Sequence, residues 1–263
     1  MNKQKTILSS KTFYRFILAI SFLSSQLPAY TQGLSNKELL GEHLTYSMHY
    51  GWFSLGKAEV WIDPEIYSVD DVPHFLVQCS IETSGFVQFF KPITACYQSL
   101  INMETLQPHE SHRDLKFGKD IDVRTDYFSF SDSIRIHAYI QDIDEHRFHS
   151  FGIEDQILDF LSSYILIRKT DFSNEEEISS NIFYSNSLYK FQLSNQKKKN
   201  YKWDSEIYNS IEAELFFPRN EYFNKKKHGS MIFTEDFQNL PFKVQIDMTL
   251  GSFYFKLKER EFY

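Results

Sequence analysis

Cysteine is scarce in this chain: Cys79 and Cys96 are the only two among 263 residues. Neither lies near the N-terminus, which excludes a lipid-modified N-terminal cysteine. Residues alternate between the two faces of a strand, and this places Cys79 on the apolar face of one predicted strand and Cys96 on the opposite face of the next. We therefore predict two free thiols and no disulfide, although an oxidising compartment would permit one.

Positive charge is also sparse. The chain carries 28 Lys and Arg against 35 Asp and Glu, a formal net charge of -7. Nucleic-acid binding needs clustered Lys and Arg for phosphate contacts, so we expect no nucleic-acid partner. Two short basic runs, 197–199 and 225–227, fall where hairpin tips are expected, and solvated turn charge is the favoured interpretation. Contact with an acidic envelope surface or lipid headgroups is the alternative.

Catalytic and metal-binding motifs are missing. No G-x-S-x-G nucleophile elbow occurs. His109 and His112 are three residues apart after a proline, whereas zinc proteases need two histidines four apart on a helix. His146 and His149 lack an evident third ligand. We predict a protein that is not an enzyme and binds no metal or cofactor.

One segment is a near match to a nucleotide-binding loop. Residues 51–57 fit G-x-x-x-x-G-K, but Ala58 stands where the motif needs Ser or Thr to bind magnesium. An alternating strand pattern follows instead of the helix that would point its amide groups at phosphate. We predict no nucleotide site and interpret Gly51 and Gly56 as turn residues of a β-hairpin.

The N-terminal segment has the pattern of an export signal. Its first 31 residues contain four Lys and Arg and no Asp or Glu, and Phe16–Leu23 is apolar but too short to span a bilayer comfortably. We predict a signal peptide over 1–32, cleaved after Ala29 or Gln32, followed by one β-rich domain over 33–263. The mature chain would be periplasmic or associated with the outer envelope.

Alternating apolar residues dominate the rest of the chain. Clear examples are 43–52 with 57–62, 74–83 with 93–103, and the stretches 206–217 and 242–257. Aromatic residues reach 17%, which suits broad pleated faces. Successive hairpins without alternating helices predict a large antiparallel meander that forms a curved sheet or half-open barrel.

One helix is predicted, over about 153–169. Ile157, Leu161, Tyr164 and Ile165 recur at steps of three and four, and basic residues fall in the last turn. The apolar face is wide, so the helix should pack on or into the sheet as a lid or plug.

Two groups of residues are candidates for a site. Asp159, Ser162 and Arg168 place polar groups on the otherwise apolar helix, and we favour buried hydrogen bonds to the sheet over a ligand-orienting role. Aromatic side chains that could face a ligand or a membrane, or cap the core, form the second group: Tyr46, Tyr50, Trp52, Phe86, Phe89, Phe90 and Tyr164.

Several short motifs recur in a set order along residues 41 to 257. They are Gly41-Glu42, Leu44, Tyr46, Gly51, Gly56, Ala58, Tyr97, Ser99, Thr105-Leu106, Pro108, Asp159, Leu161-Ser162, Arg168, Thr234, Asp236, Leu240-Pro241 and Leu250-Gly251-Ser252. This order resembles the exported bacterial domain-of-unknown-function family 3108. The resemblance implies a mainly antiparallel β domain in the cell envelope and no established activity. One departure is Ile232-Phe233, where the family often has a tryptophan.

These observations favour a non-enzymatic envelope protein whose concave aromatic sheet binds an apolar or amphipathic ligand such as a lipid. Such a carrier should contain a cavity of about 300 Å³ or more. The alternative is a structural or interaction module that binds an envelope protein or polysaccharide; it predicts a filled core and an exposed apolar patch.

The export signal makes a direct prediction. Intact-mass analysis of protein recovered from the envelope should show a chain that begins at Tyr30 or Gly33. Removal of residues 1–32 takes away four basic residues and no acidic ones, so the net charge should change from -7 to -11. A chain that retains Met1 would contradict the assignment.

Overall fold

A computed structural model describes residues 35–85, 88, 92–152, 156–172, 177–216, 228–236, 238–248 and 251–263. The predicted signal segment, the side chains of Phe86, Phe89 and Phe90, and the basic run 225–227 lie outside the described residues. The first half of the chain forms α2 (Asn36–Leu39), β1 (Glu42–Tyr50), β2 (Phe53–Ile62), β3 (Tyr67–Val69), β4 (Val72–Thr83), β5 (Ile93–Asn102), β6 (Pro108–Phe117), β7 (Asp120–Phe130), β8 (Ile134–Ile140), the 3-10 turn η1 (Gln141–Ile143) and β9 (Glu145–Phe151).

The second half carries α4, the one long helix among the described residues, and the remaining strands. These elements are β10 (Ile157–Leu158), α4 (Phe160–Lys169), β11 (Ile178–Tyr184), β12 (Ser187–Trp203), β13 (Glu206–Phe216), β14 (Gly229–Thr234), β15 (Pro241–Met248) and β16 (Gly251–Phe262). Among the described residues no helix is both long and apolar enough to cross a membrane.

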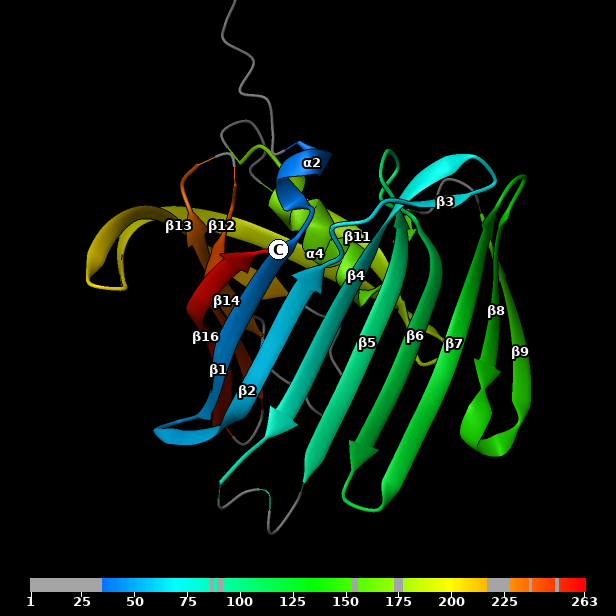
Figure 1. The fold of residues 1–263 in the computed structure, drawn as a ribbon, viewed down its shortest axis with the longest axis horizontal. Coiled ribbons are helices and arrows are strands. Elements are labelled where there is room, and N and C mark those ends of the chain that lie inside the picture. The colour runs from blue at the N-terminus through cyan, green and yellow to red at the C-terminus, as the bar shows by residue number, and fades with distance from the viewer. Residues whose placement is uncertain are drawn as a thin grey trace, which may run out of the picture. The chain divides into compact units, whose positions relative to one another are not determined.

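All sixteen strands belong to one sheet, as Figure 1 shows for most of them. Its order is β10-β11-β12-β13-β14-β15-β16-β1-β2-β4-β5-β6-β7-β8-β9, with β3 paired to β4. Every pairing is antiparallel except that of β10 with β11. The predicted meander is therefore confirmed. Within the described residues the sheet is open, because its edge strands β9 and β10 are not paired with each other.

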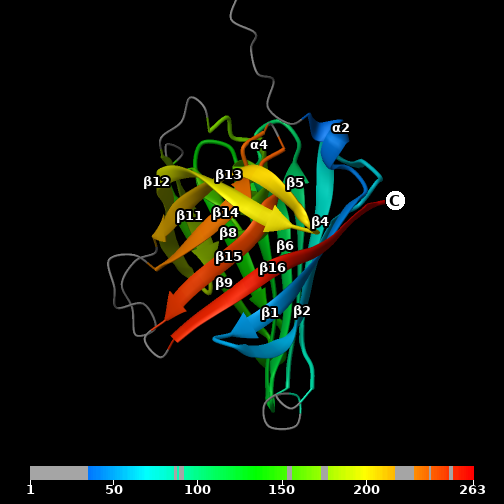
Figure 2. The same cartoon turned by 90° about the vertical axis from the view of Figure 1, so that its left-hand side faces the viewer.

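The first and last strands meet in the middle of the sheet. β1 pairs with β16 along its whole length, from Glu42 opposite Phe262 to Tyr50 opposite Phe253. Figure 2 shows these strands running obliquely between the two walls of the sheet, which are formed by β2 to β9 and by β10 to β15. The side chains alternate as the sequence predicts: Leu44, Tyr46 and Met48 are buried, while the residues between them are only half-buried.

The helix begins later than predicted. α4 starts at Phe160, because Asp159 caps it: the Asp159 carboxylate accepts from the Ser162 backbone N–H at 2.7 Å, and Ser162 Oγ accepts from the Asp159 N–H at 2.8 Å. Ile157 and Leu158 pair with β11 as a short strand, so the predicted start at 153 is wrong. Because Ile157 and Leu158 pair as a strand and Asp159 caps the helix, the helical spacing of apolar residues does not extend the helix before Phe160.

Helix α4 packs inside the curved sheet and contributes to two separate clusters. Leu161 and Ile165 pack with Phe75 and Val77 of β4, whereas Ile167 packs into the cluster of β11 to β14. A helix that is apolar nearly all round is buried on several sides. The helix predicted as a plug therefore lies inside the curved sheet and packs against both of its walls.

The two glycines of the opening hairpin have different roles. Gly51 adopts φ +57° in the β1–β2 turn, as predicted. Gly56 is not a turn residue: it lies within β2, next to the register shift between β1 and β2. A Cβ there would meet the Glu82 carbonyl oxygen at 2.0 Å, so close approach of the β4 backbone requires glycine.

Several other features differ from what the sequence predicts. Lys197–Lys199 lie within the long strand β12 instead of at a hairpin tip, although their side chains are exposed as expected. His109 and His112 lie on β6, and His146 and His149 on β9. β3, β9 and β14 were not anticipated as strands, because each is short or interrupted by polar residues.

Both cysteines are free thiols in the structure, on the faces that the alternation predicts. Cys79 is buried inside the sheet, and burial raises the pKa of its thiol to about 12, with Cys96 adding to the shift. Burial and Asp114 also raise the pKa of Cys96, which is only half-buried. Thiolate is the reactive form, so burial should protect Cys79 more than Cys96.

We expect iodoacetamide at pH 8 to modify Cys96 slowly and Cys79 more slowly still in the native protein. In urea both should react fully, giving two labels by mass spectrometry. An unreduced protein lighter by two hydrogen atoms, with no label in urea, would instead demonstrate a disulfide.

Candidate functional site

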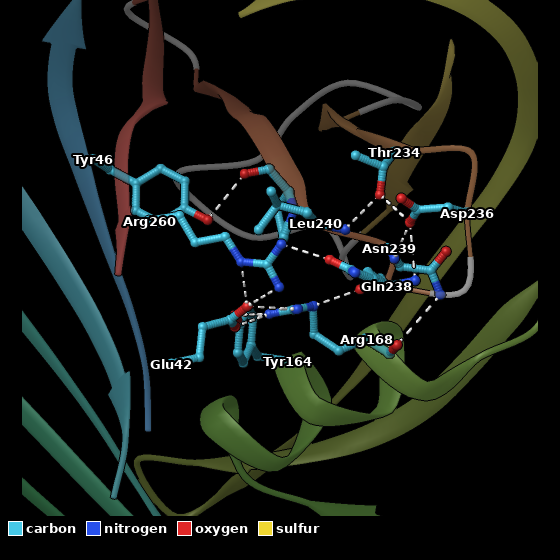
Figure 3. A network of polar contacts seen from close by, with 11 residues as sticks. Glu42, Tyr46, Tyr164, Arg168, Thr234, Asp236, Gln238, Asn239, Leu240 and Arg260 are labelled. Atoms are coloured by element: carbon cyan, nitrogen blue, oxygen red, sulfur yellow. Dashed lines mark hydrogen bonds and ion pairs between the residues drawn. The ribbon is translucent and has the colours of Figure 1, made fainter. Parts of the chain in front are cut away.

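A buried ion-pair network connects the helix to the sheet (Figure 3). Glu42 at the start of β1 accepts from Arg168 of α4, with Arg168 Nη2 at 3.0 Å from Oε1 and Nη1 bonded to Oε2. Arg260 of β16 contacts the same carboxylate, its Nε at 2.9 Å. Arg168 is 0% exposed and Glu42 is fully buried as well. Three distant parts of the chain therefore meet on one carboxylate.

The remaining donors of Arg168 are also used. Its Nε donates to the Gln238 carbonyl at 2.8 Å, and Nη1 donates to the Tyr164 hydroxyl at 2.7 Å. Burial alone would lower the pKa of Arg168, but Tyr164 and Glu42 outweigh it and raise the pKa overall. A buried charge is tolerated when it is paired and hydrogen-bonded in this way.

A tight turn closes the network on the other side. Asp236 Oδ1 accepts from the Thr234 hydroxyl at 2.5 Å and from the Gln238 N–H at 2.9 Å. The turn presents Asn239, whose side-chain amide donates to the Thr170 carbonyl at 2.6 Å and to the Ile167 carbonyl at 3.3 Å. The last carbonyls of a helix lack partners within the helix, so Asn239 satisfies the end of α4.

Below this network lies an apolar cavity of about 170 Å³ between α4 and the two walls of the sheet. This is smaller than the predicted volume of about 300 Å³ for a carrier, so a whole lipid does not fit in this conformation. The lining side chains are Tyr46, Ala58, Val60, Cys79, Ile81, Phe160, Leu161, Ser163, Tyr164, Ile167, Phe191, Leu215, Met231, Pro241, Val244, Ile246 and Phe255.

The hydroxyl groups of the lining residues are all engaged by the protein. Tyr46 donates to the Pro241 carbonyl at 3.0 Å, Ser163 donates to the Phe160 carbonyl at 2.7 Å, and Tyr164 accepts from Arg168. Burial, with Arg168 and Glu42 acting in opposite directions, raises the pKa of Tyr164 to about 12. Burial also raises the pKa of Tyr46. The walls are therefore uncharged near neutral pH and present hydrocarbon to the cavity.

The cavity extends from the network towards one end of the sheet. Its lining residues on β4 and β16 come from the halves of those strands nearest Thr83 and Gly251, and those on β15 extend from Pro241 to Ile246. The same end carries the β1–β2 turn, since the Gly51 N–H donates to the Ser252 carbonyl. In Figure 1 this end is at the bottom and α4 lies towards the top. Phe160, which is 54% exposed, lies at the rim.

A second group of charges lies on β6 and β7, where Arg113, Arg124 and Asp126 are buried and Asp122 is partly exposed. Arg113 pairs with Asp122 at 2.5 Å, and Arg124 pairs with Asp126 at 2.7 Å and donates to Asn186 at 2.8 Å. Burial raises the pKa of Asp126 despite the opposing effect of Arg124. Arg113 and Arg124 were not among the predicted site residues, although both occupy inward positions, on β6 and β7 respectively.

The predicted site residues fall into three sets. Tyr46 and Tyr164 line the cavity, whereas Tyr50 packs on Phe253 with ring centroids 4.9 Å apart and Trp52 is 84% exposed. Phe86, Phe89 and Phe90 lie outside the described residues.

Of the predicted helix-to-sheet contacts, only Arg168 reaches the sheet; Asp159 and Ser162 bond to each other as the helix cap. Glu42 and Arg260 are additions from the structure. Across the described part of the chain, no three His, Cys, Asp or Glu side chains gather as a metal site.

An open, β-barrel-like sheet with an internal helix and an apolar cavity defines the structural class. The chain belongs to the family described as "Protein of unknown function (DUF3108)", whose model matches residues 45–258. Of the family-like motifs, those containing Glu42, Arg168, Thr234 and Asp236 converge on the network around α4. A comparison with curated proteins finds no match.

Among solved structures, the chain is similar to the crystal structure of a beta-barrel-like protein of domain of unknown function DUF1849 from Brucella abortus. The TM-score is 0.56 at 9% sequence identity, and the match covers 86% of this chain and 98% of that one. At this identity the likeness shows a shared fold alone.

The network predicts a large effect of removing one charge. Arg168→Met should lower the free energy of unfolding by about 3–5 kcal/mol, because it leaves Glu42 buried with one partner fewer. Arg135→Gln, which removes an exposed ion pair with Asp132, is the control and should cost about 0–1 kcal/mol. Urea unfolding measures both.

The double variant Glu42→Leu/Arg168→Met should recover part of the loss, since no uncompensated carboxylate remains on the helix side. Additive losses in the double variant would show that packing, and not the ion pair, accounts for the effect.

Proposed function

We propose that the interior of this half-barrel binds the hydrocarbon end of an amphipathic envelope molecule without catalysing a reaction. The supporting observation is the apolar cavity beneath α4, whose lining hydroxyl groups are occupied by bonds to the protein. A polar ligand entering it would lose its bonds to water and find no replacement. An alkyl chain has no such cost.

The volume restricts the ligand. Apolar cavities of about 150 Å³ in other proteins stay dry and bind molecules the size of benzene. A cavity of about 170 Å³ therefore suits the end of one alkyl chain, with the rest of the molecule at the open mouth near Phe160. This narrows the carrier hypothesis to partial burial of the ligand.

The predicted export signal and the hydrogen bonds of the lining hydroxyl groups complete the proposal. The N-terminal segment favours a periplasmic or outer-envelope location, where amphipathic ligands are abundant. The non-enzymatic part rests on the same hydrogen bonds, because they leave no lining hydroxyl as a ready nucleophile, acid or base.

A second function, docking to an envelope protein or polysaccharide, is favoured by one surface. On the outer face of β7 to β9, Phe148 is 76% exposed and stacks on His137 with ring centroids 4.7 Å apart, and β9 is a free edge of the described sheet. Exposed edges and rings are common binding surfaces. This function needs no ligand in the cavity.

The variant Ala58→Phe tests the first proposal. It adds a ring to the cavity wall, so binding of the apolar fluorescent probe N-phenyl-1-naphthylamine should weaken by about tenfold or more, which corresponds to ~1.4 kcal/mol. Lys57→Phe adds the same ring to the other face of β2 and serves as the control. Circular dichroism verifies that both variants fold.

Equal probe binding by the parent protein, Ala58→Phe and Lys57→Phe would show that the probe binds elsewhere. The interaction module would then become the leading function.

A further inference from the structure

The β1–β2 turn exposes two large aromatic rings together. Trp52 is 84% exposed and Phe53 53% exposed, and their rings stack at a centroid distance of 3.9 Å. A single exposed apolar side chain is ordinary in a soluble protein. A stacked pair at the projecting tip of a hairpin is a concentrated apolar surface that invites a partner.

Three lysines lie beside this tip on the outer face. Lys243 and Lys256 are direct cross-strand neighbours, and their Nζ atoms lie 5.4 and 5.1 Å from the centroid of the Tyr254 ring. Tyr254 in turn donates to the Gly51 carbonyl in the turn itself. Burial lowers the pKa of His49, and the nearby Lys256 and Lys258 lower it further.

None of these lysines is held in an ion pair. Among the described residues no carboxylate lies within ion-pair distance of Lys243, Lys256 or Lys258, although Glu212 and Asp247 lie near enough to oppose part of the pKa shift of Lys243. Burial lowers the pKa of Lys243, and the charges of Lys256 and Lys199 lower it further. Like charges placed opposite each other are destabilising, so the patch would be stabilised by an anionic partner.

We propose that the tip of Trp52 and Phe53, together with the face of Lys243, Lys256 and Lys258, docks on an anionic lipid bilayer. Tryptophan favours the membrane–water interface, where its ring meets the headgroup level. Lysines held near an anionic surface are attracted to it. The aromatic tip and the lysines occur together, and an approaching bilayer would meet the rings first and the lysines next.

The spacing supports this arrangement. Lys256 is three residues along β16 from Phe253, the residue that faces the base of the tip, which is roughly 10 Å along the strand. The headgroup layer is about 5–8 Å thick on each side of the hydrocarbon core. Rings that reach the interface therefore leave Lys256, and Lys243 opposite it, within about one Debye length of the headgroups, and Lys258 lies two residues farther along the strand.

Docking in this orientation would turn the mouth of the cavity towards the membrane, because the mouth and the β1–β2 turn lie at the same end of the sheet. This consequence rests on the proposed function, whereas the docking does not. An alkyl chain could then pass from the bilayer into the cavity without crossing bulk water.

Vesicle co-sedimentation tests the docking. The purified protein should bind vesicles of phosphatidylglycerol mixed with phosphatidylcholine, and bind pure phosphatidylcholine much more weakly. Raising the salt concentration should weaken the binding. Brominated lipids should quench tryptophan fluorescence in the parent protein and lose most of this effect in Trp52→Phe, which retains Trp61 and Trp203.

Matched variants separate the two contributions. Lys256→Glu/Lys258→Glu should weaken binding to anionic vesicles roughly 30-fold or more, since each lysine contributes about fivefold. Lys190→Glu/Lys202→Glu, on exposed positions of β12, should leave it unchanged. Trp52→Ser/Phe53→Ser should weaken binding as well, while Phe148→Ser should not.

Equal binding to anionic and neutral vesicles, or unchanged binding by both tip and lysine variants, would overturn the proposal. So would a tip variant that dissociates a dimer in sedimentation velocity while vesicle binding persists, because the tip would then join two copies. Ala58→Phe should bind vesicles normally, so a failure of docking is distinguished from a failure of chain binding.

Discussion

The rest of the structure depends on one buried carboxylate, that of Glu42. It receives Arg168 from the helix and Arg260 from the last strand; Arg168 is fully buried, whereas the Arg260 side chain is 18% exposed. Burying such groups costs several kcal/mol per ion, which only a complete set of partners offsets. The helix is therefore held in one place, with its C-terminal end fixed by Asn239 and its N-terminal end capped by Asp159.

This placement explains the cavity. A sheet of sixteen strands with free edges encloses more space than its own side chains fill, and α4 occupies only the part nearest the network. The space between the helix and the β1–β2 end stays lined with hydrocarbon. Natural cores are close-packed, so an unfilled apolar cavity beside the buried ion-pair network calls for a functional explanation.

The sequence predicted the sheet because alternation is local: the faces of β1 and the positions of Cys79 and Cys96 follow from a period of two. It misplaced the helix start because parallel pairing of Ile157 with β11 is a long-range contact. Gly56 was misread for the same reason, since its requirement arises from the β4 backbone. The site was predicted in part, since Tyr46 and Tyr164 line the cavity and Arg168 is central to the network. No local sequence pattern indicates that Glu42 and Arg260 meet, and none indicates the volume of the cavity beneath the helix.

Native mass spectrometry of the protein purified from its own envelope, compared with a delipidated sample, tests whether the cavity binds an alkyl chain. We expect a co-purifying amphiphile with an alkyl chain, bound one per protein and removed by organic extraction. A protein that is empty before extraction, and takes up no alkyl amphiphile when vesicles are supplied, would contradict it.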